Sequence, residues 1–254
     1  MKIKQIVIIA TFCFLISCKE EGKQKLYQIK ANQEAIDSTI TDNVKIDSFI
    51  SPFKKRLNDE LDSPLAYAKA DLTKTDGELV SSLGNLMADI CYLQAQPVFK
   101  KRTDKIIDFV LLNHGGIRAP IPKGPITARN AFEVMPFENE LVVVELSGVK
   151  TKELLTYLAT EKKAHPVGNM SLKISREKNV FSEVMINNQP FKENHNYYVL
   201  TSDYLQQGGD NMKFFANPVN LHKLDYKLRN ALIDYFKNGD HISPNLNKRL
   251  QYAE

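Results

Sequence analysis

Four short segments of this 254-residue chain carry side chains of types and spacings that suit ligand chemistry. In chain order they are Ser82-Leu83-Gly84-Asn85-Leu86-Met87-Ala88-Asp89, Asn113-His114-Gly115-Gly116-Ile117-Arg118, Met135-Pro136-Phe137 and Thr201-Ser202-Asp203-Tyr204-Leu205-Gln206-Gln207-Gly208-Gly209-Asp210. Glycines without a Cβ let a backbone approach a ligand closely, and arginine offers a fork of donors to phosphate or ribose oxygens. Each segment alone is modest evidence, because paired glycines after a strand usually form only a turn.

In this order and spacing, the four segments resemble the C-terminal domain of the 5'-nucleotidase and UDP-sugar hydrolase family. The resemblance runs from the region of Ile46 to about Phe236. It implies an α+β fold, with helices packed on a mixed β-sheet, over a domain that we expect at residues 45–254. It also implies that the ligand is a nucleotide or nucleoside.

The resemblance gives the Asn-x-Gly-Gly-Ile-Arg loop a part in binding. Asn113 and Arg118 match the family residues that contact the nucleotide, and Gly115 and Gly116 lie between them. A structural salt bridge is the alternative for Arg118, since arginines are often paired for structural reasons.

The resemblance also implies a clamp for the base and an acceptor for the ribose. Phe137 and Tyr204 match the two aromatic residues between which the family holds the ring, and Asp210 matches the aspartate that accepts hydrogen bonds from ribose hydroxyls. Core packing is the alternative for both aromatic residues. A turn residue that bonds its own backbone is the alternative for Asp210.

Hydrolysis in that family belongs to an N-terminal metallophosphatase-type domain with two metals. Its strings Asp-x-His, Asn-His-Glu and His-x-His do not occur in this chain, and the five histidines stand apart. We therefore expect no catalytic residue, no metal site and no cofactor in this chain. The two divalent metals are expected in a separate metallophosphatase partner.

Three functions remain open at this stage. The first is a nucleotide-recognition subunit that completes a 5'-nucleotidase with the metallophosphatase partner. The second is a free-standing nucleoside- or nucleotide-binding lipoprotein without catalysis. The third is a degenerate domain used for adhesion or assembly, which a filled pocket would favour.

The elements that must position these segments follow from hydrophobic periodicity. Helices are expected over 46–61, with Pro52 marking a kink or a start, and over 79–90, 127–135, 151–158 and 224–236. Strands are expected over 106–112, 141–146, 170–174, 180–186 and 197–201. Thr127 is expected to cap the third helix, Gly84 to permit close packing, and Cys91 to lie in the core.

The first residues indicate an exported lipoprotein. Lys2 and Lys4 precede an apolar run that ends in Leu15-Ile16-Ser17-Cys18, too short to span a bilayer but suited to a signal peptide over residues 1–17. Cys18 would then be lipidated, and residues 18–44, which are mostly polar, would form a flexible tether to the outer membrane or cell surface. An ordinary secretory signal with an incidental Cys18 is the alternative.

The charge of the chain does not favour a nucleic-acid partner. The formal net charge is +4, and loss of the two leader lysines would reduce it to about +2. Nucleic-acid binding usually shows as a strongly basic patch or stripe. With only Cys91 left beside Cys18, the sequence also predicts no internal disulfide framework.

Overall fold

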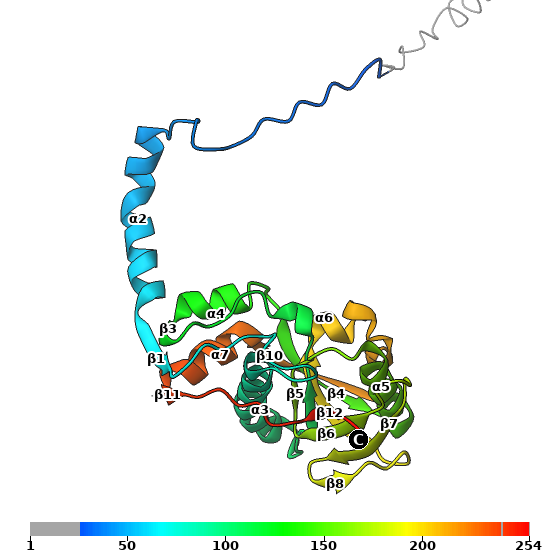
Figure 1. The fold of residues 1–254 in the computed structure, drawn as a ribbon. Coiled ribbons are helices and arrows are strands. Elements are labelled where there is room, and N and C mark those ends of the chain that lie inside the picture. The colour runs from blue at the N-terminus through cyan, green and yellow to red at the C-terminus, as the bar shows by residue number, and fades with distance from the viewer. Residues whose placement is uncertain (1–25, 240, 254) are drawn as a thin grey trace, which may run out of the picture. The chain divides into compact units, whose positions relative to one another are not determined.

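The computed structural model describes residues 26–239 and 241–253, and Figure 1 shows the fold. The leader, Cys18 and the first part of the predicted tether lie outside the described residues. Residues 26–43 form neither helix nor strand, and α2 (Val44–Asp62) follows them. The chain divides within α2 into two units, one up to Phe49 and one from Ile50. No helix in the described ranges has the length and apolar character needed to cross a bilayer.

The unit that begins at Ile50 combines helices with three sheets among its described residues. After α2, the helices are α3 (Ser82–Thr103), α4 (Ala128–Val134), α5 (Gly148–Glu161), α6 (Asp203–Gln206) and α7 (Leu228–Lys237). The central sheet has the order β10 (Asn220–Lys227), β4 (Glu140–Leu146), β9 (Tyr197–Ser202), β2 (Phe109–Leu111) and β5 (Val167–Gly168). A second sheet has the order β11 (His241–Ile242), β1 (Pro64–Ala68) and β3 (Gly124–Thr127), and a third has β12 (Leu250–Tyr252), β6 (Met170–Ile174), β7 (Phe181–Ile186) and β8 (Gln189–Pro190). Because β2 and β9 are parallel whereas β4 and β9 are antiparallel, the central sheet is mixed, and the predicted α+β class is confirmed.

The central sheet is buried on both faces. Along β4, Leu141 and Val143 join the core formed with α3 and α7, whereas Val142 and Val144 join the core formed with α5 and the third sheet. Successive side chains of a strand point to opposite faces, so a strand covered on both sides needs an unbroken apolar run. Cys91, on α3, is fully buried, which confirms its predicted place in the core.

Helix caps decide where the elements next to the central sheet begin. The Thr127 side chain accepts a hydrogen bond from the Asn130 N–H, and the Asn130 side chain accepts one from the Thr127 N–H, so the predicted cap of α4 is confirmed. Ser81 caps α3, which therefore begins at Ser82 and not at residue 79. A Cβ on Gly84 would lie 2.6 Å from the Ser81 Oγ, so this glycine permits the close packing expected of it.

Three predicted elements differ from the structure. The helix expected over 224–236 is wrong at its start, because residues 220–227 form β10 and pair with β4, and α7 begins only at Leu228. The strand expected over 106–112 is reduced to β2, since the Ile107 N–H is bound by the Gln96 side chain instead of a neighbouring strand. Pro52 lies inside α2, so of the two alternatives predicted for it, a kink or a helix start, the start is wrong.

Candidate functional site

Three loops meet at one edge of the central sheet. Strands β2 and β9 are parallel, with Val110 opposite Leu200, so their carboxyl ends lie at the same edge. Strand β4 is antiparallel to β9 and therefore begins at that edge. The segments that carry Asn113, Tyr204 and Phe137 follow β2, follow β9 and precede β4, respectively. The sheet topology thus brings together residues that are far apart in the chain.

The three loops enclose a pocket of about 280 Å³. It is lined by Asn113, Gly115, Gly116, Arg118, Phe137, Asn139, Tyr204 and Asp210. All seven residues proposed from the sequence are therefore in one cavity, although their contacts with a ligand stay a prediction. Sites that enclose a drug-sized ligand have about 300–1,000 Å³. This pocket suits part of a nucleotide and leaves the rest outside.

The Asp210 carboxylate joins two of the loops. Its Oδ2 accepts a hydrogen bond from the Asn113 Nδ2 at 2.8 Å, and its Oδ1 accepts one from the Tyr204 hydroxyl at 3.1 Å. The Tyr157 hydroxyl donates to the Asp210 carbonyl at 2.9 Å. Asp210 has a left-handed backbone (φ 50°), which aspartate tolerates better than most residues. The Asp210 side chain therefore forms hydrogen bonds with the side chains of Asn113 and Tyr204 and not with the backbone of its own turn.

Two glycines are explained by the side chains that lie against them. A Cβ on Gly116 would lie 2.7 Å from the Asn113 Oδ1, and one on Gly209 would overlap the Tyr204 ring. Gly115 differs, because a Cβ there would be 3.5 Å from Asn113 and Asp210, which is an ordinary contact. The lack of a Cβ at Gly116 and Gly209 therefore makes room for the side chains of Asn113 and Tyr204, which line the pocket.

The two aromatic residues present their rings to the solvent. Phe137 is 43% exposed and Tyr204 is 45% exposed, so neither is a core residue. Both line the pocket, Phe137 from the segment before β4 and Tyr204 from the segment after β9. A ring that is open on one face can stack on a flat ligand group.

Arg118 lies at the exposed side of the pocket. Its N–H donates to the Val134 carbonyl at 2.9 Å, and its Nη1 lies 3.4 Å from the Gly115 carbonyl. The guanidinium carbon is 6.0 Å from the Phe137 ring centroid, at the outer limit of a cation–π contact. The ion pairs found among the described residues do not include Arg118, which weighs against the salt-bridge alternative.

The Asn113–Arg118 loop is held through its own His114, which contacts His165 and Ala164. The His114 N–H donates to the His165 Nδ1 at 3.3 Å, and the His114 Nδ1 lies 3.2 Å from the Ala164 carbonyl. Burial, aided by the nearby His114 and Lys163 side chains, lowers the pKa of His165 to about 4. The His165 ring is therefore neutral near pH 7, as its acceptor role requires.

Asn139 is a lining residue that sequence reasoning missed. Its side-chain amide offers both a donor and an acceptor to the pocket. The available signal was its spacing, because in an extended segment residues two apart face the same side, and Asn139 follows Phe137 by two positions. An amide beside a stacking ring is suited to reading the polar edge of a flat ligand.

The site residues do not fit a two-metal centre. Asp210 is the one carboxylate among the described residues that line the pocket, and no histidine lines it. Across residues 26–239 and 241–253, no three His, Cys, Asp or Glu side chains come together in a way that could hold a metal ion. We therefore derive no hydrolytic step through a metal at this pocket.

Comparison with known proteins gives a family model and curated relatives. Residues 64–217 match the model described as the 5'-nucleotidase C-terminal domain. The chain is 26% identical to the trifunctional nucleotide phosphoesterase YfkN of Bacillus subtilis over 85% of its length, and 26% identical to the 5'-nucleotidase of Vibrio parahaemolyticus over 69%. It spans only 16% and 30% of the lengths of these two relatives.

Solved structures share the fold. The 5'-nucleotidase precursor of Thermus thermophilus matches 82% of this chain with a TM-score of 0.67 at 22% identity, and the chain covers 42% of that protein. The NAD nucleotidase of Haemophilus influenzae matches 84% with a TM-score of 0.63 at 16% identity, and again 42% of that protein is covered. At these identities the likeness concerns the fold alone.

Removing either ring should weaken nucleoside binding. Stacking on an aromatic side chain contributes about 1–3 kcal/mol per base, so Phe137→Ala or Tyr204→Ala should raise the Kd for adenosine roughly five- to 150-fold in titration calorimetry. Tyr67→Ala is the control, because Tyr67 is also a partly exposed aromatic residue but does not line the pocket. Loss of stability with unchanged adenosine affinity in both alanine variants would contradict a base clamp.

Asp210→Asn should reduce the preference for ribose over deoxyribose. The amide has one acceptor oxygen where the carboxylate has two, and that oxygen is already needed by Asn113 or Tyr204. The readout is the ratio of the Kd values for deoxyadenosine and adenosine. Tyr204→Phe is the control, since it removes one donor but keeps the carboxylate, and it should keep the ratio. An unchanged ratio in Asp210→Asn would exclude this role.

Proposed function

The chain belongs to the 5'-nucleotidase C-terminal domain family, and from this premise we propose that it recognises the base and ribose of a nucleotide for a phosphohydrolase. In this proposal a separate metallophosphatase chain supplies the two divalent metals and the phosphoryl chemistry. The observation that carries the proposal is the pocket itself, in which two exposed rings, two amides, a carboxylate and an arginine converge.

The chemistry of the lining supports recognition of a nucleoside. Phe137 and Tyr204 have exposed ring faces that suit a planar base. Asp210 provides carboxylate oxygens with lone pairs beyond those used by Asn113 and Tyr204, and these suit ribose hydroxyls. Arg118, at the exposed side, suits a phosphate that extends out of the pocket.

The need for a partner is supported by what the reaction requires. Hydrolysis of a phosphate ester at a two-metal site uses metal-bound water as the nucleophile and metals that clamp the phosphoryl oxygens. The pocket residues instead provide stacking surfaces and hydrogen-bond donors and acceptors, all of which suit binding. The role proposed for this chain is therefore to hold the substrate while the partner hydrolyses it.

A second candidate function is supported by the same pocket. Its two rings, two amides and one carboxylate are groups that suit a nucleoside, so a nucleoside could bind without any partner. On that account the protein is a nucleoside- or nucleotide-binding lipoprotein without catalysis. The third reading, a degenerate domain, is disfavoured because the pocket is open, at about 280 Å³.

The proposed location rests on the sequence. Cys18 follows an apolar run and precedes a polar segment, which is typical of a lipid-anchored exported protein. We propose that the chain is held at the outer membrane, on its periplasmic side or at the cell surface, through Cys18.

A phosphate-release assay separates the two functions. We expect the purified protein alone to release no phosphate from AMP with Mn²⁺, Zn²⁺, Mg²⁺ or Co²⁺, and to accelerate release when the metallophosphatase is added. The Phe137→Ala variant is the matched control, because it should bind the partner but accelerate less. Turnover by the chain alone, abolished by a chelator, would contradict the proposal. Adenosine binding without any acceleration would support the second function.

Lipidation can be followed with a metabolic acyl label. The wild-type chain expressed in a bacterium should incorporate a labelled fatty acid, and Cys18→Ser should abolish the incorporation because the thiol is the acceptor. Cys13→Ser is the matched control, since Cys13 lies within the predicted leader and should not matter. Labelling that persists in Cys18→Ser would exclude this anchor.

A further inference from the structure

The segment between α4 and β4, residues 135–139, has no regular structure of its own, yet it carries two lining residues of the pocket. Phe137 and Asn139 both extend from it. Pro136 has no N–H, and the segment lies outside the sheet ladder, so its carbonyls need other donors. The orientation of Phe137 and Asn139 therefore depends on whatever binds these carbonyls.

Three consecutive residues at the junction of β10 and α7 supply those donors. The Arg229 Nη1 lies 3.4 Å from the carbonyls of both Met135 and Phe137. The Lys227 Nζ donates to the Glu138 carbonyl at 3.0 Å, and the Leu228 N–H donates to the Asn139 carbonyl at 3.0 Å. Four of the five carbonyls in residues 135–139 are thus bound by residues 227–229.

Arg229 is the centre of this arrangement. It is buried, and its guanidinium carbon lies 4.1 Å from the Phe132 ring centroid. Its Nη2 donates to the Glu138 carboxylate, and this hydrogen bond holds the pKa of Glu138 below its usual value. Its Nε is buried without a hydrogen-bond partner among the described residues. Burying a cation with an unsatisfied donor costs free energy. The hydrogen bonds of Arg229 to the loop carbonyls and to Glu138 offset that cost.

We infer that residues 227–229 are a positioning bracket that sets the orientation of Phe137 and Asn139, with Arg229 as its main member. Arg229 does not line the pocket, so it acts through the loop and not through contact with the ligand. The planar fork of arginine offers donors on separate nitrogens to two carbonyls and a carboxylate, whereas lysine offers its three donors from one nitrogen and glutamine has only two. The inference rests on the proposed function for the identity of the ligand.

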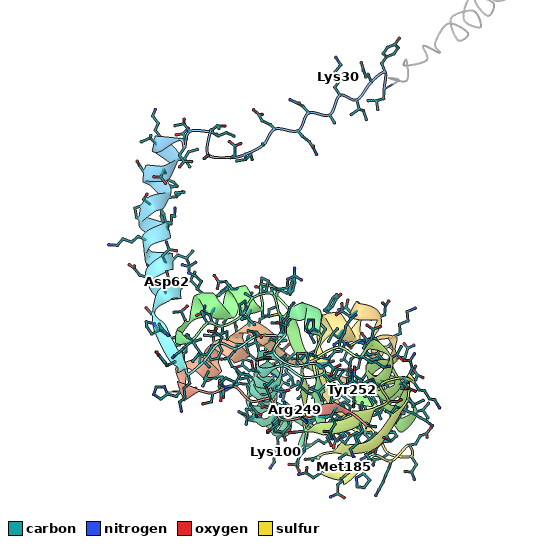
Figure 2. The ribbon with its side chains drawn as sticks, in the orientation of Figure 1. Lys30, Asp62, Lys100, Met185, Arg249 and Tyr252 are labelled. Atoms are coloured by element: carbon teal, nitrogen blue, oxygen red, sulfur yellow. The ribbon has the colours of Figure 1, made fainter. Side chains whose placement is uncertain are left out.

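Arg249 offers a matched control. Its Nη1 donates to the carbonyls of Asn85 and Val167, and its Nη2 donates to the Asp89 carboxylate. Arg229 likewise donates to two carbonyls and one carboxylate. The two side chains are similarly buried, since that of Arg249 is 14% exposed and that of Arg229 is 8% exposed. Arg249 lies in the C-terminal segment before β12 (Figure 2), and none of its partners lines the pocket. Equal substitutions at the two sites therefore have comparable structural costs but different consequences for the loop.

The binding test compares Arg229→Gln and Arg229→Lys with Arg249→Gln and Arg249→Lys, with adenosine as the probe. The Arg229 variants should raise the Kd roughly two- to tenfold, the equivalent of about one net hydrogen bond, whereas the Arg249 variants should leave it unchanged. Chemical denaturation of all four variants shows how far each substitution affects stability. Equal Kd changes at both sites would mean a general structural effect and would overturn the bracket.

A double-mutant cycle tests whether Arg229 acts through the clamp. In a Phe137→Ala background, Arg229→Gln should weaken adenosine binding less than it does in the parent, because the ring that it positions is gone. A merely structural role predicts the same factor in both backgrounds. Full additivity would therefore overturn the inference.

Amide exchange keeps this test independent of the ligand. The Leu228 N–H is held by the Asn139 carbonyl, so its exchange should become faster in Arg229→Gln and stay unchanged in Arg249→Gln. If the parent protein binds no adenosine, the proposed function fails, and the Leu228 exchange still decides whether the bracket holds the loop. If exchange rises but the Kd does not change in a parent that binds adenosine, the claim that the bracket serves recognition is overturned.

Discussion

The parallel pairing of β9 with β2, with β4 antiparallel on the other side of β9, is the constraint on which the site depends. This pairing sends the ends of β2 and β9 and the beginning of β4 to one edge of the sheet. Reversing the direction of any one of these three strands would move its loop, with Asn113, Phe137 or Tyr204, to the opposite edge. Both faces of the sheet are packed against buried side chains, and a one-residue slip would move every side chain of a strand to the opposite face. The hydrophobic core thereby fixes the register, and the register fixes the pocket.

Within this frame, the loops are held by polar contacts of two kinds. Asp210 connects the loop after β2 to the segment after β9 through Asn113 and Tyr204. The loop before β4 is held from the other side by the start of α7, through Arg229. Asp210 thus holds Tyr204, and Arg229 holds the loop that carries Phe137, so the two aromatic residues of the pocket are positioned by separate contacts. Both sets of contacts act on loops that begin or end at strands of the same packed sheet.

The sequence predicted the residues of the pocket better than it predicted their supports. Asn113 and Asp210 stand in motifs that carry their own signal, and the Thr127 cap is a local interaction that sequence reasoning can recognise. Residues 224–227, the second half of β10, are predicted as the beginning of a helix because the pairing partner β4 is distant in the sequence, and tertiary pairing overrides local periodicity. Arg229 gave no signal either, since its partners lie more than 90 positions earlier in the chain. Rules that use neighbouring residues can identify caps and motifs. Contacts between residues that are distant in the sequence, such as those of Arg229, become visible only in the folded structure.

The size and charge of the pocket determine which part of a nucleotide would lie inside it and which part a second protein could contact. A volume of about 280 Å³ leaves part of a nucleotide outside, and the Asp210 carboxylate in the lining would repel a phosphate. Arg118, the cation that lines the pocket, is exposed, so a phosphate would face outward beside it. The scissile bond would then lie outside the cavity, where the metals of another protein can reach it. A pocket of this size, with its arginine exposed, is therefore better suited to holding part of a ligand than to enclosing all of it.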